Sequence, residues 1–195
     1  MRGDKIMKNI STLRTAMTTT YSIPTRLIHW LTALLVPVTF ALGPEDLDEM
    51  PHPELDTGLQ LHETLGLVVI LLTVLRLLWA VIDKRPEAVT APRWMQMMSK
   101  AVQGALYLLL LAVPATAIVG TWLEGDALSL LGGLAVNSPL MTAKARGDSL
   151  LDLHPLLADA LLWLAGLHAA AALFHHYVLK DSVLRSMLLS DSGKN

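Results

Sequence analysis

The segment that decides the fold is DLHPLLADALLWLAGLHAAAALFHHYVLKD, residues 152–181. From Leu153 to Leu179 it is long and apolar enough to cross a lipid bilayer, which takes roughly 20 residues of α-helix. The same segment carries four histidines. Because an ionisable side chain inside hydrocarbon is costly, histidines placed there indicate a function with a definite partner.

Two of these histidines, His154 and His168, share one face of the expected helix. They are 14 residues apart, which on an α-helix is about 40° short of four full turns and about 21 Å of rise. Each of them therefore lies near a different membrane surface. This spacing predicts two cofactors stacked across the bilayer.

The composition is that of an integral membrane protein. Of the 195 residues, 53% are hydrophobic and only 16% are charged, and the mean hydropathy of +0.48 is above the range of soluble domains. The net charge of −2 gives no reason to expect nucleic acid as a partner. The absence of cysteine excludes disulfides, thiolate-ligated iron–sulfur clusters and covalent c-type haem attachment.

We expect an all-α fold, an integral-membrane four-helix bundle. The expected spans are residues 25–43, 59–82, 100–122 and 154–179, within one domain at residues 21–190. The polar segment 1–20 has no apolar core and is not expected to be a cleavable signal peptide, and residues 191–195 form a tail. A short interfacial helix is expected at about residues 127–131, in the longest connection.

The basic residues predict the orientation in the membrane. The amino-terminal segment, the connection between the second and third spans and the carboxy-terminal tail hold 12 of the 15 lysines and arginines. The other two loops hold only Lys144 and Arg146. Since basic loops stay in the cytoplasm, both termini should be cytoplasmic, and in a bacterium the protein should be a multi-pass protein of the inner membrane.

Histidines from three spans then lie at two depths. His62 and His154 both lie near the periplasmic start of their helices and are expected to pair. His29 enters from the cytoplasmic side and is expected to pair with His168. By helical rise from the cytoplasmic ends, His29 is about 10 Å deep, His168 about 18 Å and His175 about 8 Å, so depth alone also allows His175 as the partner of His29.

Two imidazoles that face each other can hold one haem iron from both sides. Neutral imidazole is a haem ligand, and six-coordinate haem suits electron transfer rather than oxygen binding. Small residues beside the histidines would let a flat macrocycle approach the helix backbone; they are Gly66, Gly166 and the run Ala169 to Ala172. The pattern predicts two non-covalent b haems.

Two arginines are candidates for binding the haem propionates, because guanidinium pairs with carboxylate bidentately. Arg26 precedes His29 by one turn, and Arg76 follows His62 by 14 residues, which brings it to roughly the depth of His168. Arg76 could equally extend its side chain to the cytoplasmic surface.

Short motifs stand in all four spans. They are RLIHW at 26–30, LHE at 61–63, RLLW at 76–79, ALYLL at 105–109 and GLHAAAA at 166–172, with HHY at 175–177 and KD at 180–181. Over about residues 21–190 this set resembles the bacterial cytochrome b561 family. The resemblance implies a four-helix inner-membrane protein with two b haems, ligated at His29, His62, His154 and His168, that exchanges electrons with the quinone pool. It also favours His168 over His175 as the inner ligand.

Two features depart from the family's pattern. Pro155 follows His154 directly, so this ligand is expected at the very start of its helix. The first periplasmic loop, residues 44–58, carries six carboxylates and no lysine or arginine. Its negative field should slow an incoming superoxide anion and favour a cationic or basic partner.

Three functions follow from these observations. The leading hypothesis is transmembrane electron transfer between ubiquinone or another quinone and a periplasmic electron donor or acceptor, with a quinone pocket bordered by His175, His176 and Tyr177. Those histidines could instead simply lie in the headgroup region. The second is a superoxide oxidase that passes electrons to ubiquinone, an activity found in the family. The third is a histidine-based transporter for zinc or copper, for which Asp159 is the only carboxylate near a span centre.

Overall fold

The computed structural model describes residues 20–44, 56–83 and 92–188. In these residues four long helices carry the fold: α2 (Ile23–Ala41), α3 (Thr57–Ile82), α4 (Arg93–Glu124) and α5 (Lys144–Phe174), which continues as the π-helical turn η2 (His175–Leu179). All four helices are long and apolar enough to cross a membrane. The expected all-α, four-helix membrane class is confirmed. Most of the acidic loop and the two terminal segments lie outside the described residues.

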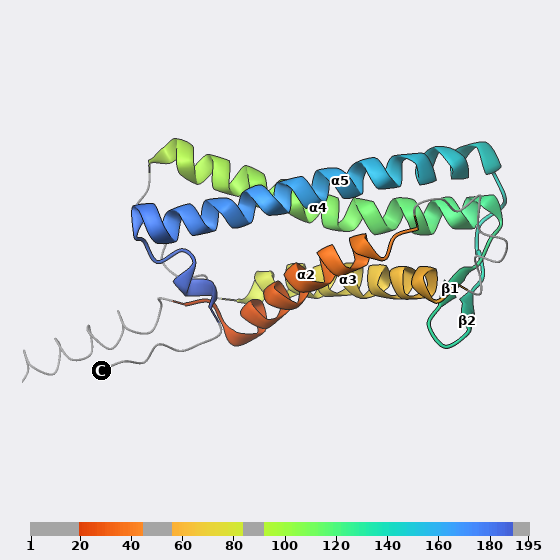
Figure 1. Cartoon of the computed structure of the whole chain (residues 1–195), viewed down its shortest axis with the longest axis horizontal. Coiled ribbons are helices and arrows are strands. Elements are labelled where there is room, and N and C mark those ends of the chain that lie inside the picture. The colour runs from red at the N-terminus through yellow and green to blue at the C-terminus, as the bar shows by residue number, and fades with distance from the viewer. Residues whose placement is uncertain (1–19, 45–55, 84–91, 189–195) are drawn as a thin grey trace, which may run out of the picture.

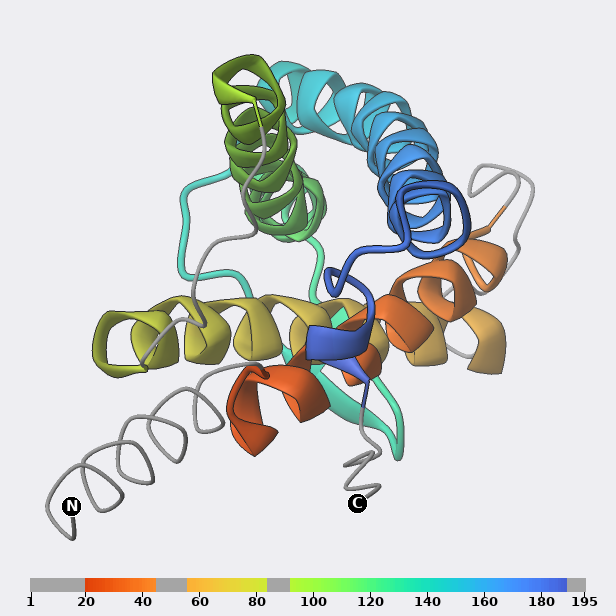
Figure 2. The same ribbon diagram turned by 90° about the vertical axis from the view of Figure 1, so that its left-hand side faces the viewer.

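The helices form two layers, with α2 and α3 in one and α4 and α5 in the other (Figures 1 and 2). A small core joins them, made of Val69 of α3, Leu110 and Val113 of α4 and Leu161 of α5. Many other large apolar side chains are exposed on the outside of the bundle, among them Leu78 and Trp163. Such a surface is unfavourable in water and suits contact with lipid.

The helix ends follow local chemistry. Ser22 caps α2 by accepting a hydrogen bond from the Thr25 amide, with a proline in the first turn, and Asp56 caps α3 by accepting one from the Leu59 amide. Gly125 ends α4 in the left-handed conformation, with φ of 99°, which glycine adopts without a steric cost.

The connection between α4 and α5 differs from expectation. Instead of an interfacial helix, it forms an antiparallel hairpin of β1 (Leu128–Leu130) and β2 (Leu134–Val136). Gly132 and Gly133 have φ of 86° and 76° in its turn, a conformation that favours a hairpin over a helix. The prediction of a helix at residues 127–131 was wrong, because the two glycines outweigh the apolar pattern before them.

A second correction concerns the start of the last helix. It begins at Lys144, so His154 lies well inside α5 rather than at its first turn. Pro155 is accommodated within the helix. The helix extends beyond its apolar part, and the apolar pattern alone does not give its true start.

Opposite the hairpin, the two ends of the described chain meet. The Tyr21 amide donates to the Ser186 carbonyl at 3.1 Å, just before α2. Residues 185–187 form the short 3-10 helix η3 (Arg185–Met187). This end of the bundle, called the termini end below, is thus closed by main-chain contact, whereas the hairpin marks the other end, called the hairpin end (Figure 1).

Candidate functional site

The structure brings the four histidines of the membrane spans together as two pairs. At the hairpin end, the imidazole rings of His62 and His154 have their centres 6.0 Å apart at an interplanar angle of 81°. At the termini end, the rings of His29 and His168 have their centres 6.5 Å apart at 83°. We call these the hairpin-end pair and the termini-end pair. Each pair joins the two layers, because one member always comes from α5.

The ring separations suit a shared metal. An imidazole nitrogen binds a first-row metal ion at about 2.0 Å and lies roughly 1.1 Å from its ring centre, so two imidazoles that bind one metal from opposite sides have centres roughly 6 Å apart. Both observed separations agree with this value. A pair of neutral imidazoles is the donor set of six-coordinate haem.

Main-chain carbonyls fix the hairpin-end pair. His62 Nδ1 lies 2.8 Å from the Thr39 carbonyl oxygen, and His154 Nδ1 lies 2.8 Å from the Val113 carbonyl oxygen. Because a carbonyl only accepts, each Nδ1 must donate, which leaves Nε2 of the neutral ring free to bind a metal. Such second contacts orient metal-binding histidines and set their tautomer.

The helices supply these carbonyls for local reasons. The Thr39 carbonyl is in the last turn of α2, where acceptors are left without regular helical donors. The Val113 carbonyl, just before Pro114 inside α4, accepts a hydrogen bond from the Thr116 hydroxyl as well as the one from His154. A Cβ atom at Gly43 would lie 3.2 Å from the Phe40 carbonyl oxygen and in ordinary contact with the His62 ring, 3.4 Å from Cε1.

The termini-end pair has a different neighbour. Arg76 Nη1 lies 2.9 Å from His29 Nδ1, and the Arg76 guanidinium carbon lies 5.5 Å from the centre of the Tyr107 ring. Guanidinium has no acceptor, so His29 Nδ1 is the acceptor here. A neutral His29 that binds iron through Nε2 would carry its proton on Nδ1, and Arg76 would then exchange this contact for an acceptor such as a haem carboxylate.

Arg26, the other predicted propionate partner, lies one turn before His29 and is 4% exposed. Its Nη1 donates to the Leu188 carbonyl at 2.7 Å. Close by, Trp30 Nε1 donates to the Met187 carbonyl. In this structure Arg26 therefore connects α2 to the last described residues.

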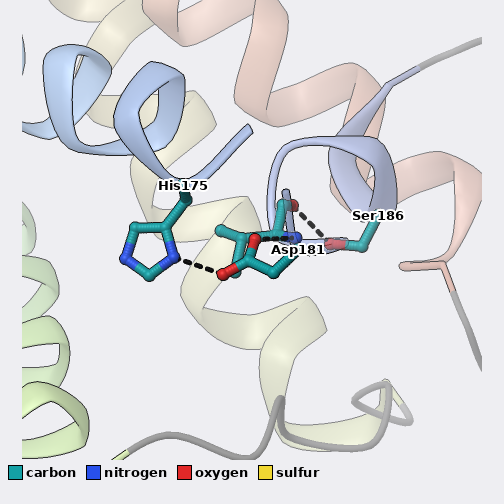
Figure 3. Close-up of polar contacts among 4 residues, drawn as sticks. His175, Asp181 and Ser186 are labelled. Carbon is teal, nitrogen blue, oxygen red and sulfur yellow. Dashed lines mark hydrogen bonds and ion pairs between the residues drawn. The ribbon is translucent and has the colours of Figure 1, made fainter. Parts of the chain in front are cut away.

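The histidines beyond the membrane part of α5 are placed apart from both pairs. His175 Nδ1 contacts the Asp181 carboxylate, which also accepts a hydrogen bond from the Val183 amide (Figure 3). Burial alone would raise the pKa of Asp181, but the hydrogen bonds from His175 and Val183 outweigh it and lower that pKa. His176 packs edge-on against Tyr177, and its buried Nδ1 has no hydrogen-bond partner among the described residues.

Several contacts of the site are absent from the predictions made on sequence. The sequence did not identify the Thr39 and Val113 carbonyls or the Tyr107 ring beneath Arg76 as contacts of the site. It also did not identify the contact of Glu63, whose Oε2 accepts a hydrogen bond from the Ser129 amide of the hairpin. Only Glu63 and Tyr107 carried a signal, since both stand in the motifs LHE and ALYLL. A main-chain carbonyl carries no signal in sequence.

A transition-metal transport path has no support in the described residues. Among them, no group of three or more histidine, cysteine, aspartate or glutamate side chains is arranged to hold a metal ion. Asp159 lies on the exposed outside of α5, where it cannot complete either histidine pair.

Comparison with known proteins places this site in a family. The family model for prokaryotic cytochrome b561 matches residues 20–189. The chain is 31% identical to cytochrome b561 homolog 2 of Escherichia coli K12, over 89% of this chain and 93% of that protein. It is 32% identical to cytochrome b562 of Cereibacter sphaeroides, over 83% and 90% of the two chains. It is 29% identical to the probable superoxide oxidase CybB of Yersinia pestis, over 85% and 94%.

The match covers the whole four-helix region, including both histidine pairs. Members of this family carry haem b, for which paired imidazoles at the observed separations are suitable ligands. The chain therefore belongs to the prokaryotic cytochrome b561 family and is a multi-pass bacterial membrane protein of electron transport.

Proposed function

We propose that this protein carries electrons across the bacterial inner membrane through two b haems, between the quinone pool and a one-electron partner on the periplasmic side. The observation that carries the proposal is the presence of two histidine pairs, each with the ring separation that one iron requires. The two pairs are 14 residues apart along α5, which is about 21 Å of helix.

In this proposal the haem iron supplies the redox chemistry, and the chain supplies ligands, position and local charge. His62 and His154 would hold one haem, and His29 and His168 the other. Arg76 would bind a propionate of the second haem, because the guanidinium lies beside that pair and can pair with a carboxylate. The charge distribution of the loops favours the termini end as the cytoplasmic end.

A quinone pocket at the termini end is part of the proposal. The π-helical turn places His175, His176 and Tyr177 there, and π-helical turns are frequent at functional sites. His176 Nδ1 is buried without a partner in the described residues, so it could bond with a quinone oxygen. The polar ends of a quinone need such a donor or acceptor when they leave water.

The test is the haem content of the purified full-length chain, measured by extraction and counted per chain. The wild type should hold two non-covalent b haems, and His62→Ala and His168→Ala should each hold one. His175→Ala is the matched control, because it removes a histidine of the same helical segment outside the pairs and should retain two haems. Two haems in His168→Ala and one in His175→Ala would contradict the assignment of the termini-end pair.

A second candidate function is superoxide oxidation coupled to ubiquinone reduction. The relative named as a probable superoxide oxidase favours it, whereas the six carboxylates of the loop 44–58 oppose the approach of an anion. If superoxide alone reduces the haems of the purified protein at a useful rate, the periplasmic partner is superoxide. If superoxide does not reduce the haems, the periplasmic partner is a cationic or basic electron donor or acceptor.

A further inference from the structure

The two histidine pairs have different electrostatic surroundings. At the termini-end pair the nearest ionic group is a cation, since Arg76 lies 2.9 Å from His29. At the hairpin-end pair each Nδ1 atom faces a neutral main-chain carbonyl instead, that of Thr39 or of Val113. The termini-end pair thus has a cation in contact with it, whereas the contacts of the hairpin-end pair are uncharged.

The charge of Arg76 is not cancelled within the described part of the protein. No carboxylate in that part forms an ion pair with it, and its contacts are His29 and the face of the Tyr107 ring. An aromatic face stabilises a cation without neutralising it. Inside a membrane the field of such a cation is screened far less than in water, so it acts on whatever charge develops at His29 and His168.

This asymmetry bears on electron flow, because reduction of a haem adds one negative charge at the iron. A neighbouring cation stabilises the reduced form and raises the reduction potential, whereas uncharged contacts do not. The propionates do not reverse this comparison, because each b haem carries the same two. The difference between the sites therefore comes from the chain.

We propose that Arg76 makes the termini-end haem the higher-potential of the two, so that electrons pass from the hairpin end to the termini end. His62 and His154 would hold the haem that gives up one electron in each transfer, and His29 and His168 would hold the haem that takes it up. The inference rests on the proposed function. Arg76 acts in it through its positive charge, from its position beside the termini-end pair.

The first measurement is a redox titration of the full-length wild type and of His168→Ala, followed by haem absorption. The wild type should give two midpoints, and the haem retained in His168→Ala should match the lower one. If the retained haem matches the higher midpoint, the inference is overturned. This comparison needs no change at Arg76, so a poorly folding Arg76 variant cannot remove it.

The second measurement replaces Arg76. In Arg76→Met the higher midpoint should fall by at least 59 mV, a tenfold change in the one-electron equilibrium, while the lower midpoint stays in place. Arg76→Lys keeps the charge and should recover most of the fall. Lys100→Met is the matched control, because it removes a cation from the exposed surface of α4 and should move neither midpoint.

Other results separate the inference from the proposed function. If the wild type holds a single haem, the proposed function fails before Arg76 is tested. If it holds two haems and Arg76→Met leaves both midpoints unchanged, or shifts both equally, only the inference fails. A fall that Arg76→Lys does not recover would also overturn it, because the effect would then come from packing and not from charge.

Discussion

Replacement of Gly147 by alanine should loosen the hairpin-end pair. Gly147 lies in the first turn of α5, where that helix meets α4. A Cβ atom there would lie 3.0 Å from the Glu124 main-chain nitrogen and 3.0 Å from the Gly120 carbonyl oxygen, whereas ordinary contacts are 3.4–4 Å. Because both neighbours are main-chain atoms, the two helices must move apart.

The expected cost follows from that geometry. Overpacking against rigid neighbours costs about 1–3 kcal/mol, and every 1.4 kcal/mol is roughly a tenfold change in an equilibrium. His154 lies two turns after Gly147, and its 2.8 Å contact with the Val113 carbonyl crosses the same interface. Separation of α4 and α5 therefore weakens the orientation of one imidazole at the hairpin end and leaves the other pair intact.

The assay is thermal release of haem from the detergent-purified protein, followed by absorption and by haem count. Gly104→Ala is the matched control, because a Cβ atom at Gly104 in α4 meets nothing within 4 Å and the gain in helix propensity is similar. Gly147→Ala should lose one haem at a lower temperature than Gly104→Ala. Equal haem content and equal thermal stability of the two variants would refute the reasoning.

Three further outcomes are expected. Gly66→Leu should fold, because a Cβ atom there meets nothing within 4 Å, but a haem count should show one haem fewer, since the side chain fills the space one turn after His62. Glu63→Ala should free the Ser129 amide, and hydrogen exchange should be faster there and unchanged in α4. The Asp181 carboxylate, whose pKa is lowered from 3.8, should stabilise the folded chain above that pH and lose this effect as the pH falls through its folded pKa. The difference in thermal stability between wild type and Asp181→Asn should therefore shrink on acidification.

The sequence alone predicted the spans and the proximity of the histidines because both depend on regular helix geometry. Apolar stretches long enough for a bilayer are visible in the chain, and a rise of about 1.5 Å per residue converts positions into depths. Depth left His168 and His175 as alternatives for the partner of His29. The structure places the His168 ring beside His29 and turns His175 toward Asp181.

The features that the sequence did not predict depend on how separate helices face each other. The start of α5 at Lys144 lies in a polar stretch that hydropathy does not distinguish from a loop. The carbonyl partners of His62 and His154 belong to other helices, and only the packing decides which carbonyl faces which ring. The hairpin followed from the conformation of Gly132 and Gly133, which an apolar pattern does not report.

The contact between the two chain ends has a consequence for the synthesis of the protein. Arg26 and Trp30, in the first span, donate to the carbonyls of Leu188 and Met187. A ribosome must therefore have made the chain as far as Leu188 before the first helix can make these contacts. Among the described residues, the termini end is the last part of the fold to close.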